Sequence, residues 1–172
     1  MYDLMSFDLV AEHLHLDSRD ELRNRLYLKA ASQLVCAYLG RNLLTETTTE
    51  QQKTSYKEFY TEEYPVQEFL EIKDIRSGRI LSLAEDTPVL STIRPDSYRN
   101  RAFRLEGISE NEVTIEYTYR FGYEVDEMPG LIQACVLELI RDRLESLSTI
   151  DTEMPTPEQR LKSINAFRKL NI

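Results

Sequence analysis

Residues Val113–Ile140 read V-T-I-E-Y-T-Y-R-F-G-Y-E-V-D-E-M-P-G-L-I-Q-A-C-V-L-E-L-I and predict a strand, a turn and a helix in that order. Apolar or aromatic residues alternate with polar ones from Val113 to Tyr119, which is typical of a half-buried strand. Gly122 can supply the positive φ that a turn needs, and Pro129, which lacks an N–H, suits the first position of a helix. Apolar residues then recur at helical spacing: Leu131, Ile132, Cys135, Val136, Leu139 and Ile140.

Two further helices are predicted nearer the N-terminus. Ser6 can cap a short helix over Phe7–Leu16, and Asp17, with Asp20 three residues later, resembles a capping box for a longer helix that ends at Gly40. The longer helix has two apolar faces, which predicts that it is covered on more than one side. One face carries Leu22, Leu26, Ala30, Leu34, Ala37 and Tyr38. The other carries Leu28, Ala31, Val35 and Leu39.

We expect this longer helix to pack against the helix that follows Pro129, because these are the longest apolar periodic segments of the chain. The residues expected to be buried between them are Leu26, Leu34, Val35, Cys135, Val136 and Leu139.

Between the two long helices, residues 42–112 predict a β-rich arm and insertion. Residues 42–64 are polar and β-branched without core periodicity, so we expect a solvent loop or a projecting hairpin arm that acts in assembly rather than in the core. Further along, Val66, Leu70 and Ile72 are expected to share one face of a strand, and Gly78 to form a hairpin turn. Phe103 and Leu105 restart the strand pattern.

The last predicted helix spans residues 156–172. Thr156 and Gln159 form a capping box around Pro157 at the first helical position. A narrow apolar stripe and a set of basic residues make this helix a candidate interface for a partner protein, and it can equally fold back to complete its own core. The candidate interface residues are Leu161, Ile164, Phe167, Arg160, Lys162, Arg168 and Lys169.

The predicted fold class is therefore mainly α with a β-rich insertion (α+β). It comprises a helical bundle core, a projecting β arm or hairpin and a C-terminal helix, in one domain over residues 1–172.

The composition of the chain argues against some classes of function. The net charge is −9, with 30 acidic residues against 21 Lys and Arg, which argues against tight general binding to nucleic acid. Cys36 and Cys135 lie in apolar stripes, so we expect buried free thiols and a protein made in a reducing cytoplasm. The sequence predicts no signal peptide and no membrane span.

The sequence predicts no catalytic, cofactor-binding or metal-binding residues. His13 and His15 are two positions apart and would point to different sides of a helix, so they cannot hold one metal ion from a single face. Glu138, Asp142 and Glu145 line up on one helix, as paired carboxylates of a hydrolase can. Arg141 and Arg143 lie between these carboxylates, which favours a solvated or interface surface.

The order of these elements resembles the head-tail connector (adaptor, or head completion) family of tailed double-stranded DNA phages. A helix ending H-L-H-L-D precedes a long helix ending A-Y-L-G-R-N-L at Leu43. Y-P-V at Tyr64–Val66 leads into strands, Y-R-F-G-Y at Tyr119–Tyr123 ends a strand, and M-P-G-L-I-Q-A opens a helix. A basic C-terminal helix ending A-F-R-K-L completes the pattern.

The resemblance implies a virion structural protein rather than an enzyme. Such a protein forms a homo-oligomeric ring, typically a dodecamer, beneath the portal protein at the head-tail interface. The ring extends the DNA channel and joins the head to a stopper or tail-completion protein, while double-stranded DNA passes through without sequence-specific binding. Two other hypotheses remain: a non-viral acidic helical protein-interaction module, and a metal-dependent hydrolase built on Glu138, Asp142 and Glu145.

Overall fold

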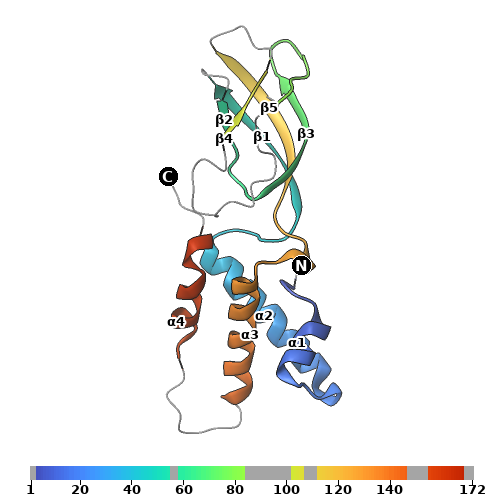
Figure 1. Ribbon diagram of the computed structural model, residues 1–172, viewed down its shortest axis with the longest axis vertical. Coiled ribbons are helices and arrows are strands. Elements are labelled where there is room, and N and C mark those ends of the chain that lie inside the picture. Colours follow the sequence, from blue (N-terminus) through green and yellow to red (C-terminus); the bar gives the residue numbers. More distant parts are fainter. Residues whose placement is uncertain (1–2, 55–57, 84–101, 107–111, 147–154, 169–172) are drawn as a thin grey trace. The chain divides into compact units, whose positions relative to one another are not determined.

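The computed structural model describes residues 3–54, 58–83, 102–106, 112–146 and 155–168. The chain divides into two compact units. The helical unit contains Met1–Leu44 and Tyr123–Ile172, and the sheet unit contains Thr45–Gly122. Figure 1 shows the helices and strands of each unit. The predicted α+β fold class is confirmed. That both units act as one connector domain stays a prediction.

The helical unit begins with α1 (Phe7–Leu14), the 3-10 turn Ser18–Asp20 and α2 (Glu21–Leu39). The predicted Ser6 cap is present, but the capping box expected for the longer helix is not. Asp17 caps the 3-10 turn, and Asp20, at the N-cap of α2, makes no side-chain cap hydrogen bond. Ser6 accepts a hydrogen bond from the N–H of Leu9 with its hydroxyl, and Asp17 accepts one from the N–H of Arg19. Gly40 ends α2 with a φ of 69°, a left-handed conformation that glycine adopts without a side-chain clash.

The C-terminal part of the helical unit contains the 3-10 turn Val125–Glu127, α3 (Gly130–Glu145), α4 (Pro157–Leu161) and the 3-10 helix Lys162–Phe167. Pro129 takes the cap position, so α3 starts at Gly130, one residue after the predicted start. As predicted, α2 packs against α3. Their shared core includes Leu28, Ala31, Val35 and Leu39 from α2 and Ile132, Cys135, Val136, Leu139 and Ile140 from α3.

The expected set of buried residues is wrong for Leu26 and Leu34. These side chains are 58% and 40% exposed, and Leu22 is 77% exposed. The other apolar face of α2, which contains Leu28 and Val35, is the one that meets α3. Sequence periodicity identified both faces correctly as apolar, but it could not say which of them this subunit covers.

The sheet unit holds five strands among its described residues. They are β1 (Glu46–Thr54), β2 (Glu58–Tyr60), β3 (Val66–Asp74), β4 (Ala102–Arg104) and β5 (Val113–Phe121). β5 is the central strand of a three-stranded antiparallel sheet of order β1-β5-β3, and β2 pairs with β4. Every second residue of β5 is buried, from Val113 to Phe121, as its alternating sequence predicts.

Aromatic rings fill the core of the sheet unit. Phe59 on β2 lies with its ring centroid 4.7 Å from that of Tyr117 on β5, and Phe69 meets Phe103 edge-on at 4.7 Å. Tyr119 stacks with Tyr117 at 5.9 Å. These contacts join both small sheets into one core.

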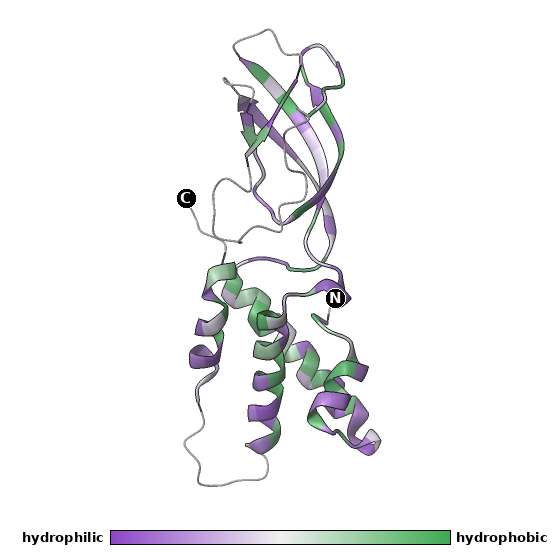
Figure 2. Ribbon diagram, in the orientation of Figure 1, coloured by the Kyte–Doolittle hydropathy of each residue, from purple (hydrophilic) through white to green (hydrophobic). Residues whose placement is uncertain are grey.

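The solvent-loop alternative for residues 42–64 is wrong for β1, whereas a projecting arm that acts in assembly stays a prediction. Glu46–Thr54 pairs along its whole length with β5, from Glu46 opposite Phe121 to Thr54 opposite Val113. Figure 2 shows that β1 is largely hydrophilic, which is why an apolar alternation was missing. Its threonines nevertheless favour extended backbone. The β-rich region therefore extends past residue 112 to Gly122.

The predicted common face of Val66, Leu70 and Ile72 is also wrong for one member. Val66 and Ile72 are buried, whereas Leu70 is 51% exposed. The register of β3 against β5 shifts between Val66 and Glu68 and again between Phe69 and Glu71. Such bulges break strict alternation, so Leu70 points to the other face. The predicted turn at Gly78 is present, with a φ of 68°.

A carboxylate on β1 anchors two tyrosines of β5. The Tyr117 hydroxyl donates to Glu50 at 2.8 Å, and the Tyr119 hydroxyl donates to the other oxygen of the same carboxylate. The backbone N–H of Glu62 also donates to Glu50, at 3.2 Å. Burial, together with the adjacent carboxylate, raises the pKa of both tyrosines, so the hydroxyls remain protonated donors.

We expect the two faces of α2 to differ sharply in their contribution to stability. Leu28→Ala removes a fully buried side chain and should lower the free energy of unfolding by about 2–5 kcal/mol. Leu26→Ala, the matched change on the exposed face, should alter it by less than about 0.5 kcal/mol. Chemical denaturation of both variants measures the difference, and equal losses would contradict this assignment of the core.

We also expect Glu50 to stabilise the sheet unit. Glu50→Ala leaves the part-buried Tyr119 hydroxyl and the Glu62 amide without their acceptor, which should cost about 1–3 kcal/mol. The Tyr117 hydroxyl keeps the Tyr60 carbonyl, at 2.6 Å, as an acceptor. Thr47→Ala on the same strand is the control, because Thr47 is exposed. Chemical denaturation of both variants measures the difference, and an unchanged midpoint in the Glu50 variant would refute the role.

Candidate assembly surfaces

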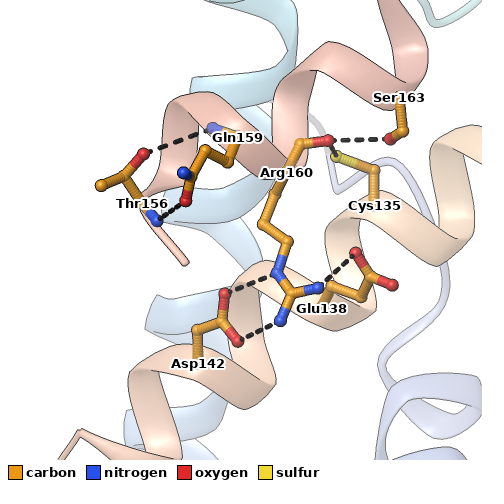
Figure 3. Close-up of polar contacts among 7 residues, drawn as sticks. All are labelled: Cys135, Glu138, Asp142, Thr156, Gln159, Arg160 and Ser163. Atoms are coloured by element: carbon orange, nitrogen blue, oxygen red, sulfur yellow. Dashed lines mark hydrogen bonds and ion pairs between the residues drawn. The ribbon is translucent and has the colours of Figure 1, made fainter. Parts of the chain in front are cut away.

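The C-terminal segment starts with the predicted cap. The Thr156 hydroxyl accepts from the N–H of Gln159 at 3.4 Å, and the Gln159 side chain accepts from the N–H of Thr156 at 2.8 Å. Pro157 occupies the first turn of α4. The capping box therefore starts a new helix here, as shown in Figure 3.

Arg160 ties α4 to α3. Its guanidinium donates to both oxygens of Asp142 at 3.0 Å and to Glu138 at 3.4 Å (Figure 3). A bidentate contact of this kind fixes the relative orientation of the two side chains better than a single ion pair does. The hydrogen bonds to Asp142 raise the pKa of Arg160 further. Two of the three carboxylates considered for a hydrolase are thus used to hold the chain's own C-terminal segment.

The apolar stripe of this segment lies in the core of the helical unit. Leu161 is 3% exposed and Ile164 is fully buried, and Phe167 packs against the same cluster while partly exposed. In the structure the C-terminal segment therefore folds back onto its own helical unit at these three residues. Leu161 and Ile164 are not available to a groove on another protein in this conformation.

The basic residues of the candidate interface differ in their exposure and in the groups that they contact. Arg160 is bound by the carboxylates of α3, whereas Lys162 and Arg168 are exposed. The Arg168 guanidinium lies 5.6 Å from the centroid of the Tyr38 ring. Lys169 lies outside the described residues. Partner contact through Lys162 and Arg168 stays a prediction.

Both cysteines are free thiols, as expected. The Cys135 thiol donates to the carbonyl of Arg160 at 3.7 Å, and burial raises the pKa of Cys135 to about 11. Burial also raises the pKa of Cys36. At neutral pH both remain protonated, so they behave as core residues rather than nucleophiles.

Within the described ranges, no three His, Cys, Asp or Glu side chains come together in a group that could hold a metal ion. None of the helices described is both long and apolar enough to cross a membrane.

The structure reveals exposed apolar residues that sequence analysis did not assign to a surface. On α2 these are Leu22, Leu26 and Leu34, and near the start of α3 they are Val125 and Leu131, which are 36% and 47% exposed. The second apolar face of α2 was the available signal. That face predicts cover on a second side of α2, whereas the structure shows its leucines exposed.

The fold resembles that of a chain in a solved gene transfer agent (GTA) particle. A chain in the neck of an empty GTA particle, computed with C6 symmetry, has a TM-score of 0.52 at 14% identity, over 96% of this chain and 89% of that one. A chain in the neck of a native GTA particle, computed with C12 symmetry, has a TM-score of 0.48 at 17% identity, over 95% and 89%. A chain in the virion of a native GTA particle has 0.46 at 15%, over 91% and 81%.

The first likeness indicates a shared fold over nearly the whole length of both chains, while the two lower TM-scores do not establish one. No protein-family model matches the sequence, and no curated protein sequence matches it.

We expect the C-terminal segment to be required for a stable helical unit. Ile164→Ala should cost about 2–5 kcal/mol because Ile164 is fully buried, whereas Lys162→Ala in the same 3-10 helix should change stability by less than about 0.5 kcal/mol. Truncation after Asp151 should give an aggregated or molten fragment. In a Cys36→Ser background, Cys135 should react slowly with a thiol reagent in the full chain and rapidly in the fragment. A soluble fragment with a protected Cys135 would contradict this role.

Proposed function

We propose that this chain is a structural subunit of the neck that joins head and tail in a tailed-phage-like particle. The observation that carries the proposal is the shared fold with a chain in the neck of an empty GTA particle, which extends over 96% of this chain and so includes both of its units. The resemblance of the sequence to head-tail connectors points to the same place in a particle.

We further infer that the subunits form a ring beneath the portal protein. The neck of that GTA particle was computed with C6 symmetry, which repeats each chain around an axis in multiples of six. A dodecamer satisfies this symmetry. The ring would extend the DNA channel and receive a stopper or tail-completion protein on its other side.

The charge of the chain suits a conduit for DNA. A net charge of −9 in each copy is multiplied in a ring, so the assembly repels phosphate as a whole. From Glu106 to Glu127 the sequence contains seven acidic residues against one basic residue, Arg120. An acidic ring would conduct DNA without holding it, which is a structural task rather than an enzymatic one.

The proposal is tested by expressing the chain with the portal protein of the same particle and imaging the product by electron microscopy. We expect rings of this chain, with copies in a multiple of six, attached to one face of the portal. The free protein should show no measurable binding to duplex DNA at physiological salt. If no rings form and the free protein binds duplex DNA with submicromolar affinity that falls steeply with added salt, the chain is a nucleic-acid binder and not a neck subunit.

A further inference from the structure

Helix α2 has an apolar stripe that the subunit leaves uncovered. Leu22 and Leu26 are 77% and 58% exposed, and Leu34 is 40% exposed. Ala30 and Ala37 are also exposed, so they continue the stripe with small side chains. At 100° per residue this stripe is centred roughly 180° from the core face of α2. It therefore points away from α3, against which the core face packs.

The charges beside this stripe are basic, in a protein that is acidic overall. Arg23 and Lys29 lie beside the stripe, whereas the Arg25 guanidinium packs over the Phe7 ring of α1, 4.2 Å from its centroid. Arg23 and Arg25 form exposed ion pairs with Asp20 and Glu21, which solvent weakens. Lys29 is exposed, and no ion pair of it occurs within the described parts of the chain. A partner surface complementary to this stripe is therefore apolar and bordered by acidic residues.

The helical unit carries a second surface of that chemistry. Val125 and Leu131 are exposed apolar residues, and Glu124, Asp126 and Glu127 lie beside them in sequence without a basic residue among them. The three carboxylates form no ion pair with any described part of the chain. This acidic patch lies at the start of α3, on a different element from the α2 stripe.

We propose that the α2 stripe of one subunit binds the acidic patch at the start of α3 of a second copy of this chain. This inference rests on the proposed ring. A ring is closed by head-to-tail contacts, in which two different patches of the same subunit meet their opposites on the two neighbours. The stripe and the patch are both apolar, and their borders have opposite charge, which favours contact and fixes its direction. A second copy also explains why an exposed leucine stripe persists on a folded subunit.

The test introduces one substitution into each surface separately and then mixes the two variants. Leu26→Asp damages the stripe, and Leu131→Asp damages the acidic patch. Both residues are exposed, so the variants should keep the circular dichroism spectrum and thermal midpoint of the natural sequence. Each variant alone should associate with itself at least about tenfold more weakly, measured by sedimentation. Leu70→Asp, at an exposed leucine of the sheet unit, is the matched control and should assemble normally.

Mixing distinguishes this contact from other arrangements. The Leu26→Asp chain keeps its acidic patch and the Leu131→Asp chain keeps its stripe, so one intact contact can form between them. We expect a 1:1 heterodimer that grows no further, whereas the natural sequence forms rings. Undiminished self-assembly of either variant, or no heterodimer in the mixture, would overturn the proposed contact while leaving the ring in place.

Three other outcomes would also overturn the contact. A large fall in the thermal midpoint of the Leu26→Asp monomer would show that another part of the same chain covers the stripe. If the Leu26→Asp chain forms rings but loses the portal, the stripe is a portal contact instead. If the natural sequence forms no ring, alone or with the portal protein, the proposed function fails together with the contact.

Discussion

The short pairing between Leu43–Leu44 and Tyr123 is the constraint on which the rest of the structure depends. Tyr123 donates its N–H to the carbonyl of Leu43 at 2.8 Å, and Leu44 forms a parallel bridge with Tyr123. These residues belong to the helical unit, and the chain between them forms the whole sheet unit. Because the pairing brings the ends of the insertion together, α2 and α3 can meet across a large gap in sequence. The shared core of the helical unit follows from that closure.

Local signals in the sequence specified the ends of the helices well. Ser6 and Thr156 cap α1 and α4 as predicted, and glycines end α2 and turn the chain after β3. Asp17 instead caps the 3-10 turn that precedes α2, and α2 itself has no side-chain cap. Caps and turns depend on neighbouring residues alone, so a single sequence contains the information. The alternation of β5 was equally informative because one of its faces is fully buried.

The errors arose where the outcome depends on partners distant in sequence. β1 contains almost no apolar residue, and what makes it a strand is pairing with β5 and the anchoring of two tyrosines by Glu50. For α2, two apolar faces are visible in the sequence, but which one meets α3 is decided by the packing of the whole unit. The apolar stripe of the C-terminal segment was ambiguous in the same way, because the sequence does not say whether it meets its own core or a partner. In the structure Arg160 binds α3, and Leu161 and Ile164 are buried.

The insertion of one unit within the other has a consequence for biosynthesis. During translation α1 and α2 emerge first, but α3, which covers the core face of α2, follows only after the 78 residues of Thr45–Gly122. At ribosomal rates of roughly 5–20 residues per second, α2 waits roughly 4–16 s with both apolar faces open to water. The sheet unit is complete in sequence before α3 begins, so it can fold on the ribosome while the helical unit is still half made. This order of synthesis makes the nascent α2 a natural target for cellular chaperones.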